Sequence, residues 1–530
     1  MGWLDPNEWI VSHHAVSTAL AIPYIGADRA SGGLSPPSSL PDVNAKALPT
    51  PGIEAAMQTL LGVVLLAVMT LPGSPDERPN ILLVLSDDHS AAHVGCYGNP
   101  DVKTPNLDRF AAEGVRFDRA YVTCPQCVPS RASIMTGRSP VAIQMTRFSA
   151  PLPAEFKVFP QLLRAQGYFT GVAGRTYHLD GSVLPEESKK VFDLQGLRTF
   201  AKRLDYVKTA GKGPVILSQF REFLDLVPKG KPFVLQLCFS DPHRPLDRDA
   251  IPKPHDPNSL KLPPHYPDTS AVRDDFARYY DEIARFDADF GTVLGELRKR
   301  GLAENTVVLF MGDNGASQLR GKGTLYEFGV HVPLIVRWPG VIKPGSSTTE
   351  LVSGEDLAPT LLEAAGVAAP PEMTGRSVLR LLRGQPFEGR EYVFAERGAH
   401  GSALPTTSAN FDLGRCVISK RHKLIYNALW QIPYTPVDFA GDLFWTELRK
   451  MNRDGELSPE LAKLYFAPTR PMFEVYDLES DPAEMRNLAG TKETEALEKT
   501  LKGALQEWMI LQRDFVPLPV PPTPGQGRTG

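Results

Sequence analysis

Four short apolar runs recur along this chain, and polar residues follow each of them. The runs cover residues 80–85, 168–173, 232–239 and 306–311. Short, largely apolar segments without strict alternation are typical of strands that are buried on both faces of a parallel sheet. Ligands bind outside the carboxyl ends of such strands, so we expect the polar residues that follow the four runs to meet in one cleft.

Cys127 opens a run of a different kind, Cys-Val-Pro-Ser-Arg-Ala-Ser-Ile-Met-Thr-Gly-Arg at residues 127–138. Pro129 suits the first turn of a helix, which predicts Cys127 at the helix N-terminus, where free N–H groups and the helix dipole favour an anion. Arg131 follows one helical turn later on the same face. Cys124 and Cys127 also form a Cys-x-x-Cys pair, but the sequence holds no second pair for a zinc site and no thioredoxin-like pattern.

This run resembles the signature of the formylglycine-dependent sulfatases, Cys-x-Pro-Ser-Arg followed by Thr-Gly-Arg. The resemblance implies that a formylglycine-generating maturation enzyme oxidises Cys127 to an aldehyde, and that the substrate is a sulfate ester or a sulfamate. It covers about residues 79–512 and includes a C-terminal box at residues 476–488. The family belongs to the alkaline phosphatase superfamily, whose fold is therefore expected here.

The first and last of the apolar runs end in residues suited to a metal. Three carboxylates and an amide form an all-oxygen set, which suits Ca²⁺ or Mg²⁺ and suits zinc or copper poorly. Taken singly, Asp-Asp and Asp-Asn-Gly are also ordinary turn and cap residues. The resemblance favours the metal site over the turn-and-cap interpretation. It implies one divalent ion per chain, with ligands at Asp87, Asp88, Cys127, Asp313 and Asn314.

The resemblance also assigns catalytic roles to cations and histidines. Arg131 and Lys322 would contact the aldehyde hydrate and the sulfate, and His178 and His243 match the two family histidines. Arg175 stands where the family usually has Lys, so a planar fork replaces a point donor. Taken singly, each histidine is more often a structural residue than a catalyst.

The predicted fold is α/β, with a large mixed, mostly parallel sheet sandwiched by helices and a smaller C-terminal α+β subdomain of an antiparallel sheet and a helix. We expect the catalytic domain at residues 79–385 and the subdomain at 386–515, followed by a Pro-rich tail at 516–530. Helical spacing is expected from 276 to 300 and from 493 to 512.

Composition and targeting signals add further limits. The net charge of -4 is dispersed, so we expect no nucleic-acid partner. Residues 60–71 are too short to span a bilayer but suit a signal-peptide core, so residues 57–78 read as a signal-like segment. We therefore expect export to the periplasm or the extracellular space, without stable membrane insertion. Residues 1–56 read as a disordered extension or an upstream mis-start of translation.

The sequence thus predicts a sulfatase that acts on a sulfated saccharide. Residues 127–137, 241–244 and 473–488 look most like the branch with heparan N-sulfatase, while the step from Arg175 to His178 looks more like iduronate-type sulfatases. Two alternatives stay open: a phosphodiesterase or phosphonate hydrolase of the same superfamily, and a non-catalytic carbohydrate binder if Cys127 is never oxidised. Aromatic residues between 405 and 466 could face sugar rings or pack in the subdomain.

Overall fold

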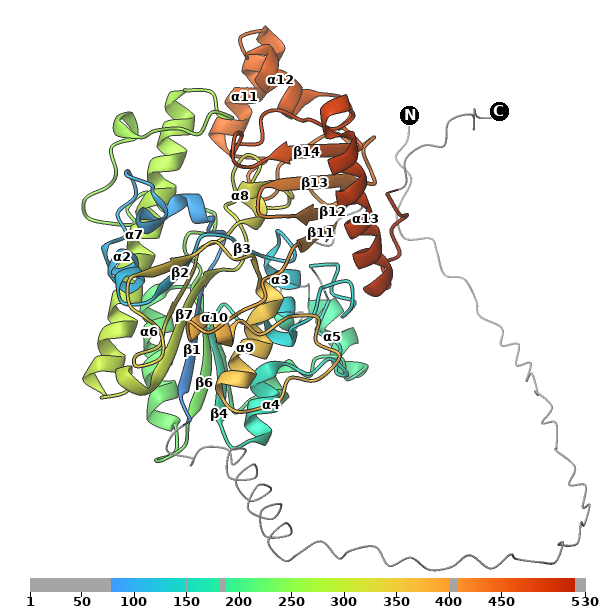
Figure 1. Ribbon diagram of the computed structural model, residues 1–530. Coiled ribbons are helices and arrows are strands. Elements are labelled where there is room, and N and C mark those ends of the chain that lie inside the picture. The colour runs from blue at the N-terminus through green and yellow to red at the C-terminus, as the bar shows by residue number, and fades with distance from the viewer. Residues whose placement is uncertain (1–77, 149, 181–185, 401–407, 520–530) are drawn as a thin grey trace, which may run out of the picture. The chain divides into compact units, whose positions relative to one another are not determined.

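The computed structural model describes residues 78–519, apart from residues 149, 181–185 and 401–407 (Figure 1). The extension predicted at residues 1–56 lies outside the described residues, as do the signal-like segment except residue 78 and the tail beyond residue 519.

A mixed sheet of eight strands carries the larger part of the fold, in the order β5-β4-β6-β1-β7-β8-β2-β9. The four predicted apolar runs are β1 (Asn80–Ser86), β4 (Phe169–Gly174), β6 (Phe233–Cys238) and β7 (Thr306–Gly312). They are neighbours in the sheet and all pair in parallel. The remaining strands are β2 (Val115–Phe117), β5 (Tyr206–Thr209), β8 (Leu334–Arg337) and β9 (Ser346–Thr348). Since only β8 pairs in antiparallel fashion, the prediction of a mostly parallel sheet is confirmed.

Helices cover both faces of this sheet (Figure 1). On one face lie α2 (Pro105–Ala112), α6 (Gly213–Leu226) and α7 (Ser270–Lys299). On the other lie α3 (Cys127–Thr136), α4 (Phe159–Ala165), α9 (Leu357–Ala364) and α10 (Leu379–Leu382). Two further helices are α5 (Glu186–Leu194) and α8 (Glu327–Val330), and a short two-stranded sheet joins β3 (Ala120–Tyr121) to β10 (Val352–Ser353).

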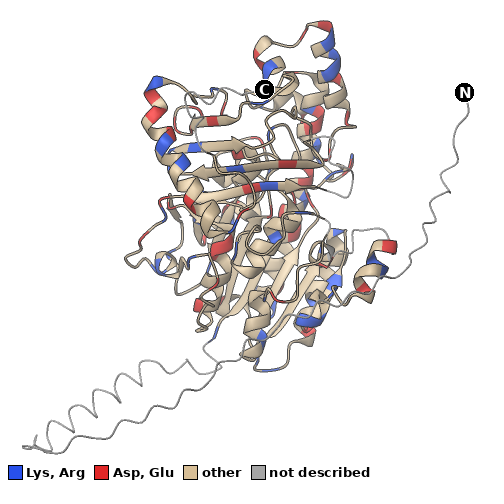
Figure 2. Ribbon diagram, turned by 90° about the vertical axis from the view of Figure 1, so that its right-hand side faces the viewer, with Lys and Arg blue, Asp and Glu red and all other residues tan. Residues whose placement is uncertain are grey.

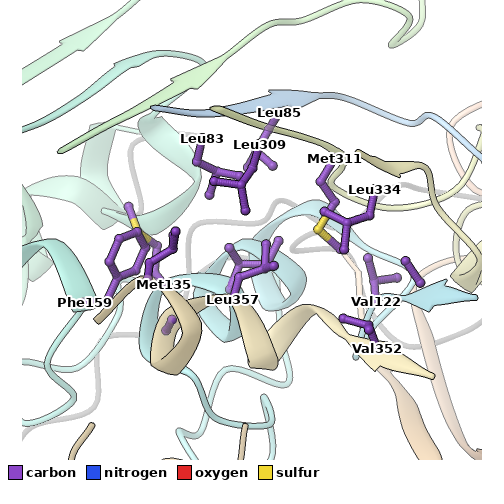
Figure 3. Close-up of a cluster of buried hydrophobic side chains, with 14 of the residues drawn as sticks. Leu83, Leu85, Val122, Met135, Phe159, Leu309, Met311, Leu334, Val352 and Leu357 are labelled. Carbon is purple, nitrogen blue, oxygen red and sulfur yellow. The ribbon is translucent and has the colours of Figure 1, made fainter. Parts of the chain in front are cut away.

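The position of β1 between two layers of helices explains why its sequence is apolar without alternation. Leu83 and Leu85 point to the layer with Met135 of α3 and Leu357 of α9 (Figure 3). The intervening Leu82 and Val84 join the opposite core, under α2, α6 and α7. Burial on both faces removes the need for a polar side of the strand.

A four-stranded antiparallel sheet forms the C-terminal part, in the order β11-β12-β13-β14. Its strands are β11 (Val393–Ala399), β12 (Phe411–Ile418), β13 (His422–Asn427) and β14 (Phe473–Asp477). The closing helix α13 (Glu495–Leu511) packs on it through Leu505 and Trp508. Two more helices, α11 (Leu443–Asp454) and α12 (Pro459–Phe466), lie between β13 and β14. The predicted C-terminal antiparallel sheet with a helix packed on it is thus confirmed.

Three of the aromatic residues that could have faced a sugar are packing residues. Phe439, Phe444 and Trp445 are buried in one cluster with Tyr465 of α12. The Phe439 and Phe444 rings stack at 5.2 Å. The apolar face of α11 therefore uses these rings for its own core.

Acidic and basic positions are interspersed along the ribbon, as the dispersed charge of the sequence predicts (Figure 2). Within the described ranges, no helix combines the length and apolarity that crossing a membrane requires. All five cysteines fall in these ranges, and each is a free thiol in the structure.

Candidate active site

Three carboxylates meet at the carboxyl edge of the central sheet. Ser86 of β1 pairs with Gly312 of β7, so the residues that follow these two partners leave the sheet at the same level. The backbone N–H of Asp88 donates to Oδ1 of Asp313 at 3.0 Å. Asp88 takes a left-handed backbone conformation with φ of 63°, which Asp tolerates better than most residues. Asp87, Asp88 and Asp313 are completely buried.

Helix α3 brings Cys127 to this carboxylate cluster. Cys127 is the first helical residue, as predicted from Pro129, and its Sγ lies 3.3 Å from Oδ1 of Asp87. One turn later, Arg131 donates from Nε to Asp313 at 2.8 Å and from Nη2 to Asp87 at 3.1 Å. Gly137 ends the helix in a left-handed conformation. Arg131 therefore neutralises the acids and does not project freely toward the thiol.

The loops after β4 and β6 add Arg175, His178 and His243. Nε of Arg175 lies 2.9 Å from Asp87 and 3.4 Å from Nε2 of His178. Its Nη2 donates to Nε2 of His243 at 3.1 Å, while Nδ1 of His243 donates to the carbonyl of Arg244. Arg175 thus bridges an acid and two imidazoles, which a single ammonium group could not do with the same planar geometry.

Lys322 reaches the cluster from a tight loop after β7. Its Nζ lies 2.9 Å from Asp88 and 2.7 Å from Asp438. Both flanking glycines are required by close approach: a Cβ on Gly321 would lie 2.0 Å from the carbonyl oxygen of Ala316, and one on Gly323 would lie 2.5 Å from Val437. Close packing therefore requires glycine on both sides of Lys322.

The C-terminal part supplies two residues that sequence reasoning missed, Asp438 and His400. Nε2 of His400 lies 3.3 Å from Oδ1 of Asp438, and Nδ1 accepts from Gln126, the residue before Cys127, at 2.7 Å. His400 follows β11, and Asp438 lies in the connection between β13 and α11. Neither stands in a motif. The sequence signal that precedes Asp438 is a single proline-containing turn, Thr-Pro-Val-Asp.

Opposing charges control the ionisation of this cluster. Burial would raise the pKa of Asp87, but Arg175 and the other basic groups around it together outweigh burial and hold the pKa well below its usual range. Burial raises the pKa of Asp88 to about 6 against the attraction of Lys322, and burial together with the charge of Asp87 raises the pKa of Asp313 to about 6. Four carboxylates, counting Asp438, face three fixed cations. The centre therefore has too little positive charge.

Burial also shifts the pKa values of the thiol and the two imidazoles of the site. Burial and then the adjacent Asp87 raise the pKa of the Cys127 thiol well above its usual range. Burial and then Lys322 lower the pKa of His243 to about 4, and burial and then Arg131 hold the pKa of His178 well below its usual value. Both imidazoles are therefore neutral at pH 7 in the free protein.

The donor set fits a hard divalent cation. Atoms of Asp87, Asp88, Cys127 and Asp313 all lie within 4.8 Å of one another. Oδ1 of Asn314 is buried and has no hydrogen-bond partner among the described residues, while its Nδ2 donates to Asp88 at 2.8 Å. An orphaned carbonyl oxygen beside three carboxylates is what a calcium or magnesium site requires.

The structure therefore brings together all ten residues that the sequence singled out. The catalytic and metal-binding roles assigned to them stay predictions. What the geometry adds is that each cation of the set contacts an acid: Arg131 and Arg175 contact Asp87, and Lys322 contacts Asp88. A buried cluster of acids, cations and neutral imidazoles at the carboxyl ends of parallel strands is the kind of place where α/β enzymes bind and convert their substrates.

The comparison with known families identifies that class further. A sequence model of the sulfatase family matches residues 79–367, and a model of the C-terminal region of N-sulphoglucosamine sulphohydrolase matches residues 315–425. The chain belongs to the sulfatase family. It is a sulfuric ester hydrolase.

Relatives and solved structures agree with this family. An ulvan-active sulfatase of Formosa agariphila is 28% identical over 84% of this chain and 76% of its own length. Human N-sulphoglucosamine sulphohydrolase is 28% identical over 83% and 92%, and human arylsulfatase A is 32% identical over 60% and 70%. A protein solved in complex with its substrate D-glucosamine-2-N,6-O-disulfate shares the fold, with a TM-score of 0.62, 21% identity, and coverage of 84% and 100%.

The lysine loop gives a direct test of this geometry. In Gly321→Ala, the new Cβ cannot coexist with the Ala316 carbonyl, so the loop must shift and carry Lys322 with it. We expect kcat/KM on a sulfate ester to fall about 100-fold, the scale of a misplacement by about 1 Å. Gly295→Ala is the matched control, because that glycine lies within α7 and its Cβ meets no atom within 4 Å. The control should keep activity and gain about 0.5–1 kcal/mol of unfolding free energy. Full activity in Gly321→Ala would contradict the assignment of the loop.

Proposed function

We propose that this sulfatase removes sulfate from a sulfated saccharide, with N-sulfoglucosamine as the first substrate to test. The observation that carries the proposal is the ring of Arg131, Arg175, Lys322, His178 and His243 around Cys127 and the acids. These cationic and imidazole side chains surround position 127, and a tetrahedral anion such as sulfate is bound by donors of that kind.

Position 127 needs modification for this chemistry. An unmodified Cys127 thiol stays protonated at neutral pH, because burial and Asp87 disfavour the thiolate. We propose that it is oxidised to formylglycine, whose hydrate supplies a nucleophilic hydroxyl and a second hydroxyl for release of sulfate. Asp87, 3.3 Å from Sγ, is placed to accept a hydrogen bond from a hydroxyl at that position.

We further propose Asp87, Asp88, Asp313 and Asn314 as ligands of one Ca²⁺ or Mg²⁺ ion, with position 127 beside it. When bound, the ion supplies Lewis-acid stabilisation of negative charge on the sulfate oxygens. It would also give the centre a net positive charge, since four carboxylates face only three fixed cations. That balance favours an anionic substrate over a neutral one.

The protein's own cations and imidazoles would then bind and orient the substrate. Lys322 contacts Asp88 and Asp438, and Arg175 contacts Asp87 and His243, so both cations lie beside position 127, where the sulfate oxygens would enter. His243 is neutral in the free protein, but an anion beside it raises the pKa of its imidazole, which prepares Nε2 to give a proton to the leaving group. His178 contacts Arg175 and fixes its guanidinium.

The proposed substrate class rests on the relatives. The C-terminal model that matches here is that of N-sulphoglucosamine sulphohydrolase, and it spans both Lys322 and His400. Ulvan-active sulfatases and N-sulphoglucosamine sulphohydrolase are both, by name, enzymes of sulfated saccharides. Phosphonate monoester hydrolases share the fold at 20% identity, which leaves ester hydrolysis at phosphorus as the rival function.

A maturation enzyme and export also remain proposals. The apolar residues 60–71 support export to the periplasm or beyond, and they lie outside the described residues.

A substrate panel tests the saccharide assignment. Sulfate release is measured on N-, 2-O-, 4-O- and 6-O-sulfated glucosamines, on choline sulfate and on a phosphonate monoester. We expect turnover of a sulfated sugar, fastest for N-sulfoglucosamine, and none in Cys127→Ala, which lacks the nucleophile and removes a single side-chain atom at the helix start. Fast turnover of choline sulfate or of the phosphonate, with no sugar hydrolysed, would refute the assignment.

Metal analysis tests the acidic cluster. After treatment with a chelator, the protein should take up one Ca²⁺ or Mg²⁺ per chain, measured by titration calorimetry and elemental analysis. Asp313→Asn removes one anionic oxygen ligand, so its metal affinity should fall by more than the about 10- to 100-fold that loss of an outer-sphere partner costs. Asp454→Asn, at the exposed end of α11, is the matched control and should bind normally. Unchanged metal binding in Asp313→Asn would rule out this ligand set.

A further inference from the structure

Asp438 is a carboxylate of the site that has no step assigned to it in the proposed reaction. Its Oδ2 lies 2.7 Å from Nζ of Lys322 and 3.8 Å from Nε2 of His243, and its Oδ1 lies 3.3 Å from Nε2 of His400. The side chain of Lys322 is 0% exposed, whereas that of Asp438 is 29% exposed. Asp438 therefore stands on the solvent side of Lys322 and His243, where the rest of the substrate must lie when its sulfate enters.

The carboxylate is held in place by its neighbours in the chain. Val437 is buried against Gly323, and its carbonyl accepts from Ser317 at 3.3 Å. Phe439 on the other side is buried in the α11 core. Asp438 itself has φ of 67°, a left-handed conformation that costs energy in a non-glycine residue. Fixed neighbours and a strained backbone indicate that the position of this carboxylate is maintained by the fold.

Binding of sulfate would change what Asp438 faces. In the free protein, Lys322 contacts Asp88 and Asp438 at once. A sulfate group that contacts Lys322 is a third anion on the same ammonium, so Asp438 loses part of its neutralising partner. Its negative charge is then available to whatever group leaves from sulfur beside His243.

Sulfamates and sulfate esters differ in the charge of that leaving group. Hydrolysis of a sulfamate breaks the S–N bond and forms an S–O bond to the oxygen of water, and the nitrogen takes both protons of that water and leaves as an ammonium ion with a sulfate dianion. Hydrolysis of an ester breaks the C–O–S link at sulfur, and the oxygen takes one proton and leaves as a neutral alcohol with hydrogen sulfate. Only the sulfamate develops positive charge on the departing atom.

We propose that Asp438 determines specificity for sulfamates over sulfate esters, by placing a fixed carboxylate beside the leaving nitrogen as it becomes ammonium. This inference rests on the proposed function and deepens it, because it selects an N-sulfated amino sugar among sulfated saccharides. Stabilisation that is made only as charge develops lowers the barrier of that reaction and leaves the ester reaction unchanged.

The test compares two substrates in two variants. Asp438→Asn keeps the side-chain shape, and Asn tolerates a left-handed backbone, so the fold should survive. We measure kcat/KM on N-sulfoglucosamine and on an aryl sulfate for the wild type, Asp438→Asn and the control Asp454→Asn. The ratio of kcat/KM on the sulfamate to kcat/KM on the ester should fall about 10- to 100-fold in Asp438→Asn, the scale of one charge interaction at short range. The control should change neither rate.

Product inhibition of aryl sulfate hydrolysis provides a second measurement that does not depend on turnover of the sulfamate. At mildly acidic pH, glucosamine should inhibit the wild-type enzyme more strongly than N-acetylglucosamine, and Asp438→Asn should abolish the difference. Equal losses on both substrates would overturn the role of Asp438. Equal inhibition of the wild type by glucosamine and N-acetylglucosamine would overturn it as well. If the wild type hydrolyses the aryl sulfate but no sulfamate, this inference fails while the sulfatase activity stands. If it hydrolyses neither and position 127 is an aldehyde, the proposed function fails with it.

Discussion

The rest of the site depends on one constraint: three carboxylates are buried together at one edge of the sheet, and their charge must be balanced. Asp87, Asp88 and Asp313 are 0% exposed and within ligand distance of one another, which is costly unless cations balance them. The parallel register of β1 and β7 forces the juxtaposition. Arg131 from α3, Arg175 after β4 and Lys322 after β7 then supply the balance from three directions, and a divalent cation would complete it. With that ion bound, positive charge would exceed negative charge in the centre, so binding of an anion would follow from the same balance.

Lys322 connects this centre to the C-terminal part of the fold. It contacts Asp88 of the large sheet and Asp438 of the connection between β13 and α11, and Gly323 beside it packs against Val437. On the opposite side, His400 after β11 accepts from Gln126, which precedes Cys127. The two parts of the molecule therefore meet at the groups that would hold sulfate and its leaving group. Differences in the C-terminal part can then alter substrate choice without disturbing the acids.

Much of this arrangement could be predicted from the sequence. The apolar runs marked four strands correctly, because burial on both faces leaves no polar alternation, and Pro129 marked the start of α3. The contact of Arg131 with Asp313 could not be predicted, since spacing along a helix gives its direction and not its partner. Asp438 and His400 could not be found either, because they belong to loops whose position depends on packing of the C-terminal sheet. The aromatic residues of that region showed the same limit: the sequence favoured packing for Phe439 and Trp445 but left contact with a sugar open, and the structure places both in the core.

The central claim is that this buried centre acts through an aldehyde at position 127, and one measurement tests it most directly. The protein is purified after expression with a formylglycine-generating enzyme, digested, and the peptide that contains residue 127 is weighed by mass spectrometry. The account predicts a loss of about 18 Da relative to the cysteine peptide, with sulfatase activity rising in proportion to the converted fraction. Full activity in protein whose residue 127 is entirely an unmodified thiol would contradict the account.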